Sequence, residues 1–168
     1  MEAHHERFMR LAIEEVWKGH AAGEQPFGCV IVRDGEVIGR GHNKQNSTFD
    51  ATAHAETLVI RNTTVNLKIH KLTGCTLYTT CEPCVMCVGA TVNSGVSTLV
   101  MGARLAKMRN FSGEMFSPDE YEGGAFNFHE YTVERLVEMG GFQLQIVTGV
   151  LEEECENIYR NTKVQLTR

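Results

Sequence analysis

The sequence predicts an α/β fold, a three-layer α-β-α sandwich around a five-stranded mixed sheet. Three observations support this fold class. The expected elements alternate in the order α-β-β-α-β-α-β-α-β-α. An Asp34-Gly35 pair between two apolar runs is typical of a type I′ hairpin, so the first two strands should be antiparallel. Helices separate the third, fourth and fifth strands, which favours right-handed parallel crossovers between them.

The length and composition of the chain fit one globular domain. The 168 residues, 42% of them hydrophobic, are enough to bury a core, so we expect a single domain over 1–168. No apolar run approaches the roughly 20 residues that a membrane span needs. The polar start, Met1 to Glu6, lacks the apolar stretch of a signal peptide. We therefore expect a cytoplasmic protein with no membrane partner.

The first half of the chain is expected to form two helices and a hairpin. The helices cover 5–20 and 53–62, the second with Thr52 as its N-cap. The hairpin strands cover 29–32 and 37–38, and a polar loop follows from Gly39 to Ser47. The side chains expected to face the core from the two helices are Phe8, Met9, Ala12, Ile13, Val16, Trp17, Ala55, Leu58 and Val59.

The second half alternates strands and helices around one long connection. The segment 103–130 exceeds the usual connection of about 2–6 residues and is rich in aromatic residues. It is either a surface excursion with its own small apolar cluster or a flap over a pocket. The remaining elements are expected as strands over 76–80, 97–102 and 143–147 and as helices over 84–93, 133–139 and 152–166.

The clustering of the cysteines suggests that some of them have a chemical role. Six cysteines stand at positions 29, 75, 81, 84, 87 and 155, so three of them fall within seven residues. Without an export signal, cysteines are better interpreted as thiols, metal ligands or catalytic groups than as disulfides. We expect Cys29, Cys75 and Cys155 to be core residues.

Two short motifs, His54-Ala55-Glu56 and Pro83-Cys84-Val85-Met86-Cys87, carry the candidate chemistry. Each lies where a helix is expected to begin. Cysteines three positions apart on a helix point the same way, and the positive end of the helix favours thiolate over thiol. The thiolates of Cys84 and Cys87 and the imidazole of His54 make three ligands for Zn²⁺. Three protein ligands leave a fourth position open to water, which is the catalytic pattern.

Glu56 is the expected proton carrier. On a regular helix its side chain would project about 200° away from that of His54. At the first turn, however, the chain is still entering the helix, so the carboxylate can approach a zinc-bound water without becoming a ligand. Zinc lowers the pKa of such a water to about 7, and a nearby carboxylate can accept its proton.

Other interpretations of the same residues were weighed. Cys81, Cys84 and Cys87 recur every three residues, as at the start of an iron–sulfur run, but position 91 is Thr and the proline precedes the cysteine. A closed structural zinc site with Cys81 as fourth ligand would leave Glu56 without a role. No P-loop, dinucleotide fingerprint or His-Glu-x-x-His motif is present in the sequence.

The combined pattern H-x-E…P-C-x-x-C is the signature of zinc deaminases. On these residues the chain resembles the cytidine-deaminase-like superfamily, and within it the branch of guanine, cytosine and tRNA adenosine deaminases. The resemblance extends from Pro26-Phe27-Gly28 through Thr80-Cys81-Glu82-Pro83-Cys84 to the last helix. It implies this superfamily's fold, Zn²⁺ as cofactor, and hydrolytic deamination with Glu56 as the catalytic proton carrier. It also implies a homodimer with sites at or near the subunit interface.

The resemblance also suggests substrate-binding residues. Asn43 matches a position where these families use asparagine to bind the base, and we favour this role over the alternative of a turn-forming asparagine after a strand. Phe27 would stack on the substrate ring or else be a buried aromatic before the first strand. Ala55, between the ligand and the proton carrier, is included among the expected substrate contacts. Cys81 is expected beside the ligands or in the core.

Three classes of function remain open: a deaminase of a small heterocyclic amine, a tRNA wobble-adenosine deaminase, and a non-catalytic zinc domain, which ranks last. Cys84 to Ala90, Gly102-Ala103-Arg104 and Gly149-Val150-Leu151 look like the tRNA enzymes, whereas Pro26-Phe27-Gly28 and Thr80-Cys81-Glu82 look more like guanine deaminases.

Charge favours a deaminase of a small heterocyclic amine over a tRNA deaminase. The net charge is −5, and the last segment, from Glu152 to Arg168, carries four acids against three bases, although a tRNA-binding helix should be basic. The aromatic segment 103–130 also suits enclosure of a small ring. We therefore expect a guanine-like base or nucleoside as substrate, with tRNA as the alternative.

Overall fold

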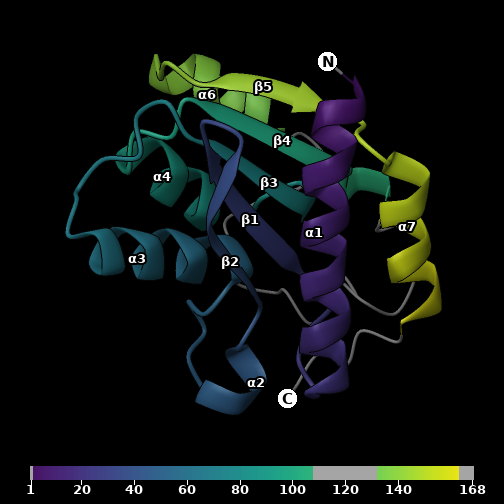
Figure 1. The fold of residues 1–168 in the computed structure, drawn as a ribbon. Helices are drawn as coiled ribbons and strands as arrows, with labels where there is room; N and C mark the ends of the chain where they lie inside the picture. The colour runs from purple at the N-terminus through teal and green to yellow at the C-terminus, as the bar shows by residue number, and fades with distance from the viewer. Residues whose placement is uncertain (1, 108–131, 163–168) are drawn as a thin grey trace.

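The computed structural model describes residues 2–107 and 132–162. The elements are labelled as in Figure 1. In chain order they are α1 (Glu2–Ala21), β1 (Gly28–Arg33), β2 (Glu36–His42), α2 (Gln45–Thr48), α3 (Ala55–Leu67), β3 (Thr76–Cys81), α4 (Val85–Asn93), β4 (Thr98–Ala103), α6 (Val133–Gly140), β5 (Gln145–Thr148) and α7 (Glu152–Asn161).

One five-stranded mixed sheet organises these elements. The strand order is β2-β1-β3-β4-β5. Strand β1 pairs antiparallel with both β2 and β3, whereas β3, β4 and β5 run parallel to one another. The predicted antiparallel hairpin and parallel crossovers are therefore confirmed, and so is the fold class.

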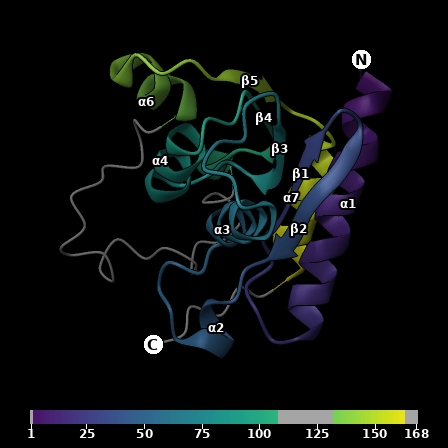
Figure 2. The ribbon, with the colours of Figure 1, turned by 60° about the vertical axis from the view of Figure 1, so that its left-hand side comes forward.

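Helices cover both faces of the sheet, with α1 and α7 on one side and α3, α4 and α6 on the other (Figures 1 and 2). Alternating residues of the strands enter opposite cores, as the two-residue period of a strand requires. Val30 and Tyr78 pack with α1 and α7, whereas Ile31 and Leu77 pack with α3 and α4. Both faces of the central strands are thus buried, and the three-layer prediction is confirmed.

The hairpin has the predicted turn but a longer second strand. Asp34 and Gly35 have φ values of 52° and 79°, as a type I′ turn requires. Residues 39–42, predicted as loop, continue β2. A side chain at Gly39 would collide with Thr63 of α3, so the glycine lets the helix approach the strand closely. The loop prediction was wrong for these residues because it relied on the polar character of the stretch, whereas Gly39 serves close packing in a strand.

The start of α3 also differs from the prediction. Its N-cap is His54, with φ −68° and ψ 150°, and not Thr52. The backbone N–H and the hydroxyl of Thr52 both donate to Asp50 Oδ1, at 2.8 and 2.7 Å, so Thr52 belongs to the turn before the helix. The helix also runs five residues beyond the predicted end at Asn62, to Leu67.

Most of the predicted core positions are confirmed, with two differences. Trp17, expected on the apolar stripe of α1, is 47% exposed because it lies at the margin of the stripe, one position beyond the fully buried Val16. Leu58 is only half-buried. Cys29, Cys75 and Cys155 are fully buried, as expected for core residues.

The end of the chain and the long connection are covered only in part. Helix α7 ends at Asn161, before the predicted 166, because Thr162 turns to an extended conformation with φ −96° and ψ 121°. Of the segment 103–130, residues 108–130 lie outside the described residues, and with them the choice between surface excursion and flap. None of the described helices combines the length and apolar character needed to cross a membrane.

Candidate metal centre

The N-termini of two neighbouring helices build the candidate site. His54 is the N-cap of α3 and Cys84 is the N-cap of α4, both with extended backbone. Their carbonyl groups accept the first helical hydrogen bonds, from Leu58 and Val88, each at 2.9 Å. Neither side chain caps its own helix, so the imidazole and the thiol point away from the helix backbone and remain available for another partner.

The three predicted ligands come together in space. Nδ1 of His54 lies 3.5 Å from Sγ of Cys84 and 3.6 Å from Sγ of Cys87. One ligand atom from each residue lies within 4.8 Å of the other two. Tetrahedral Zn²⁺ with bonds of about 2.3 Å to sulfur and 2.0 Å to nitrogen separates these atoms by about 3.5 Å. The donor set therefore fits zinc in both chemistry and spacing.

The local electrostatics favour a thiolate in this cluster. Hydrogen bonds from Cys87 and His54 outweigh burial and lower the pKa of Cys84 to about 4. The same bond to Cys84, together with burial, raises the pKa of Cys87. The hydrogen bond to Cys84 raises the pKa of His54. Negative charge thus already collects at the helix N-termini, where a divalent cation would be held.

Glu56 lies beside the cluster, at the start of α3. Only 6% of its surface is exposed. The hydroxyl of Thr79 donates to its Oε1 at 3.1 Å, and Sγ of Cys87 donates to its Oε2 at 3.4 Å. Burial, and then the charge of Cys84, raise the pKa of its carboxyl. His54 is the N-cap and stands outside the helix, so the 200° angle of a regular helix does not apply, as expected for a first turn.

The structure adds two neighbours that the sequence analysis missed. Thr79 holds Glu56, and the hydroxyl of Thr57 lies 3.5 Å from Sγ of Cys87. Thr79 shares a sheet face with Leu77, which packs against the α3 side. A threonine at such an inward position of a buried strand is a signal for a polar partner, and could have indicated this contact.

The predicted substrate residues lie in different environments. Ala55, backbone included, is fully buried in the core beneath α3, so none of its surface is open to a ligand in this structure. Asn43 is 1% exposed. Its Oδ1 accepts from the backbone N–H of Gln45 at 2.9 Å, and its Nδ2 donates to Oε1 of Gln45 at 2.8 Å. It therefore forms the turn that was the alternative interpretation of this residue.

Phe27 and Cys81 both contact the core. The ring of Phe27 is half-buried and lies 5.5 Å from that of Tyr159, at 34° between the planes. The carbonyl of Phe27 accepts from the backbone N–H of Asn43 at 3.0 Å, so these two residues are neighbours. Cys81 is 3% exposed, and burial raises the pKa of its thiol, as expected for a packing residue.

A mixed sheet between two helical layers, with a His-Cys-Cys cluster and a buried glutamate at two helix N-termini, defines a zinc-dependent hydrolytic deaminase. The family described as the cytidine and deoxycytidylate deaminase zinc-binding region matches residues 2–103. The chain belongs to this family, and its cofactor is Zn²⁺.

Relatives of two kinds share this fold. The tRNA-specific adenosine deaminase of Bacillus subtilis is 40% identical over 152 residues, which cover 89% of this chain and 83% of that protein. A structure from a study of A-to-I editing by tRNA:A34 deaminases has 33% identity and a TM-score of 0.70, and covers 90% of this chain and 98% of that one. Guanine deaminase from Nitrosomonas europaea has 28% identity and a TM-score of 0.74, with coverages of 92% and 82%.

Proposed function

We propose that this chain deaminates adenosine at the wobble position of tRNA to inosine. The main support is the 40% identity to a tRNA-specific adenosine deaminase over most of both chains. Two guanine deaminases with a similar fold are 28% and 32% identical. This proposal replaces the guanine-like small molecule that charge and loop composition had favoured, and adopts what was then the alternative.

The structure weakens the charge argument that had favoured a small substrate. The acids of α7 are largely paired with bases of the same molecule. Glu154 accepts from Arg10 at 2.7 Å, and Lys107 lies 2.9 Å from Glu152 and 3.1 Å from Glu156. A paired acid projects a weaker field than an isolated one, so the count of four acids overstates the repulsion of a phosphate backbone.

We propose that His54, Cys84 and Cys87 hold the zinc and that Glu56 is the catalytic proton carrier. Bound zinc supplies Lewis-acid activation of a water, whose pKa falls to about 7. Glu56 accepts a proton from the attacking water and delivers it to the ring nitrogen next to the reacting carbon. It then carries a proton to the amino group, so that water is consumed, the C–N bond breaks and ammonia leaves. Thr79 keeps the carboxylate in place through Oε1.

The three expected substrate residues keep their roles as proposals. Asn43 would bind the base by exchanging its bond with Gln45 for one to the ring. The half-buried Phe27 would contribute through the edge of its ring, whereas the fully buried Ala55 would contact the base only if the start of α3 opened. The homodimer expected from the family resemblance stays a prediction.

Guanine deamination is the second candidate. It is supported by the TM-score of 0.74 to the Nitrosomonas europaea enzyme and by Thr80-Cys81-Glu82, which resembles guanine deaminases. We would measure ammonia release from guanine, cytosine, adenine, their nucleosides, pterins and triazines beside inosine formation in a tRNA with adenosine at the wobble position. The proposal expects turnover of the tRNA. Turnover of guanine with no inosine in the tRNA would overturn it.

A further inference from the structure

Phe49 is the most exposed of the large apolar side chains in the described part of the chain. It is 96% exposed and follows the short helix α2. It belongs to a loop that is closed by a 2.9 Å hydrogen bond from the backbone N–H of Lys44 to the carbonyl of Ala53. A phenylalanine ring left almost wholly in water gains nothing from the hydrophobic effect, so the fold itself does not explain this residue.

The backbone at Phe49 is also unusual. Its φ of 53° and ψ of 29° lie in the left-handed region, where a side chain costs free energy that glycine would avoid. Bulky residues with such backbone angles are rare and tend to mark functional positions. Exposure and strain therefore coincide at one residue.

The loop that carries Phe49 is braced. Glu24, 5% exposed, accepts from the backbone N–H groups of Asn46 at 2.9 Å and of Ser47 at 3.0 Å. Oγ1 of Thr48 donates to the carbonyl of Lys44 at 2.6 Å. These bonds hold the loop backbone on both sides of α2, so little further ordering of the backbone is needed when a ligand binds to the ring.

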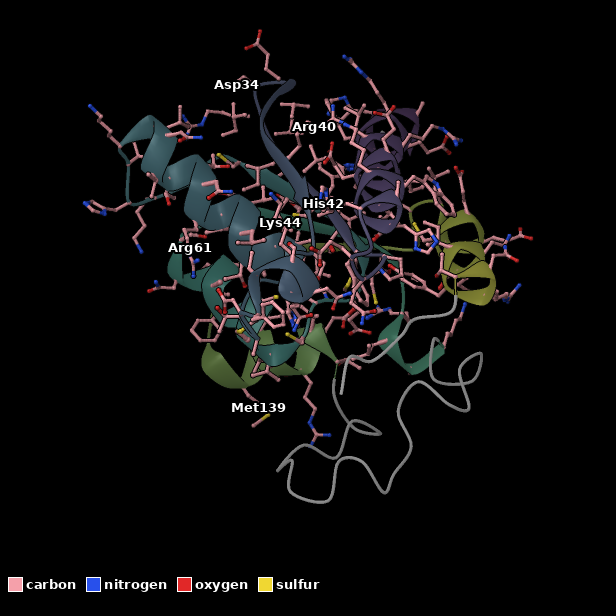
Figure 3. All side chains as sticks on the ribbon, turned by 90° about the horizontal axis from the view of Figure 1, so that it is seen from below. Asp34, Arg40, His42, Lys44, Arg61 and Met139 are labelled. Atoms are coloured by element: carbon pink, nitrogen blue, oxygen red, sulfur yellow. The ribbon has the colours of Figure 1, made fainter. Side chains whose placement is uncertain are left out.

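The braced loop adjoins the metal centre. Phe49 precedes the ligand His54 by five residues, and five residues span at most about 17 Å. Asn43, the proposed base-binding residue, stands just before the loop. Figure 3 labels Lys44, at the start of the loop, near the middle of its view. The ring thus lies within a few nucleotides of a base bound at the zinc site.

We propose that Phe49 is a stacking platform for a nucleobase that flanks the target base in a single-stranded RNA loop. This inference rests on the proposed tRNA function. An RNA deaminase must take its target out of the stack, which leaves neighbouring bases splayed and available to aromatic side chains. Apart from Phe49 itself, the loop from Lys44 to Asp50 consists of polar residues. A single aromatic face among hydrogen-bonding groups suits one base.

The test uses the full-length zinc-loaded protein and an anticodon stem-loop RNA with the target adenosine. We would compare wild type, Phe49→Ala, Phe49→Leu and Phe49→Trp. Phe49→Ala and Phe49→Leu should raise KM about tenfold, within the range of losses on removal of a base-stacking aromatic, with a smaller change in kcat. Phe49→Trp should restore the wild-type KM. The matched control is Met139→Ala, at a 77% exposed residue of α6 labelled in Figure 3, which should leave KM unchanged.

Abasic substitutions identify the stacked base. At one flanking position, removal of the base should raise the wild-type KM by the same factor as Phe49→Ala, with no further loss when the two are combined. Equal KM values for wild type and Phe49→Ala would overturn the stacking platform. So would KM increases from Phe49→Ala and from the abasic substitution that multiply at every flanking position. Neither result would overturn the proposed tRNA function. A change in sedimentation of Phe49→Ala would assign the ring to a second copy and also overturn it. A wild type inactive on the stem-loop but active on guanine would overturn the proposed function itself.

Discussion

At the scale of single residues, the account depends on Glu56. Its carboxyl is buried beside the ligand cluster, between a hydroxyl donor and a thiol. Burial, and then the charge of Cys84, raise the pKa of the carboxyl, which suits a group that must both accept and return a proton. Glu56 lies just inside α3 and His54 just outside it. Two residues of one tripeptide can therefore serve different purposes, His54 as a metal ligand and Glu56 as a proton carrier.

Removal of the Glu56 carboxylate should separate metal binding from turnover. Glu56→Gln keeps the size of the side chain and its bond from Thr79, whereas Glu56→Ala removes both. We expect both variants to retain one zinc per chain and to lose about 10²–10⁴-fold or more in kcat, the usual contribution of a general acid–base group. Metal analysis and inosine formation measure the two quantities. Near wild-type turnover in Glu56→Gln would contradict the assigned role.

The residues of the site were predictable from spacing, but their contacts were not. His54, Glu56, Cys84 and Cys87 follow from two short motifs, because ligand chemistry restricts residue type and separation. The partner of Glu56 could not be found this way. Thr79 lies 23 positions away in sequence, and only strand pairing and helix packing bring its hydroxyl to the carboxylate.

At the scale of elements, close contact between α1 and β1 fixes one side of the sheet. Gly28 begins β1 against the backbone of α1, and a Cβ there would collide with the carbonyl of Ala12 and approach the backbone nitrogen of Val16 to 2.8 Å. The hydrophobic core on this face includes Phe8 and Val16. The absence of a side chain at Gly28 therefore determines how near the helix can lie.

Gly28→Ala should force α1 away from the sheet. Because the obstacle is backbone, which cannot rotate aside, we expect the free energy of unfolding to fall by about 1–3 kcal/mol. The control is Gly89→Ala in α4, where a Cβ meets nothing within 4 Å and helix propensity should add about 0.5–1 kcal/mol. Urea unfolding followed by circular dichroism measures both. The opposite order of stabilities would show that the α1–β1 contact is not tight.

The type of an element was predictable where its apolar residues recur with a clear period. The prediction failed where close packing, and not such a period, determines the element. The stripe of α1 predicted the helix, and the Asp34-Gly35 turn predicted the hairpin. The end of β2 was missed because Gly39 and Gly41 have no side chain for a pattern to record. Helix α2 was missed because its four residues are too few to show a helical period.

At the scale of the whole molecule, one carboxylate ties the site to distant parts of the sheet. Glu82 precedes Pro83 and Cys84 and is 4% exposed. Its oxygens accept from the backbone N–H of Leu105 at 3.1 Å, from that of Val133 at 3.0 Å, and from Arg104 at 3.2 Å. The turn that holds Cys84 is thus joined to the end of β4 and to the start of α6.

Arg104 makes this connection dependent on pH. It also donates to both oxygens of Glu134, at 3.0 and 2.6 Å, and this bond lowers the pKa of Glu134. A carboxyl with a lowered folded pKa stabilises the fold above its unfolded pKa, and the contribution is lost as pH falls through the folded pKa. The stabilisation should therefore be complete at neutral pH and lost in acid.

Arg104→Met should lower the free energy of unfolding by about 2 kcal/mol at pH 7, because buried Glu82 loses its charged donor. The difference from wild type should shrink as pH falls from about 5 towards 3, as Glu134 is protonated. The control is Arg10→Met, which breaks the exposed pair with Glu154 and should change stability by less than about 1 kcal/mol. Urea unfolding across this pH range measures each difference, and a pH-independent difference would contradict the role of Glu134.

Fold and reaction class were predictable for the whole molecule, but the substrate was not. Net charge is a sum over the chain and does not record which acids are paired. Glu152, Glu154 and Glu156 counted against RNA until the structure placed Lys107 and Arg10 beside them. Substrate choice depends on the field and shape around the site, which charge counting does not resolve.

The most direct measurement is inosine formation at the wobble position of a tRNA by the zinc-loaded wild type, with Glu56→Ala as the blank and guanine as the competing substrate in a parallel ammonia assay. The account predicts conversion of adenosine to inosine in the tRNA with a higher kcat/KM than for guanine, and none in the blank. An unmodified tRNA together with rapid release of ammonia from guanine would contradict it.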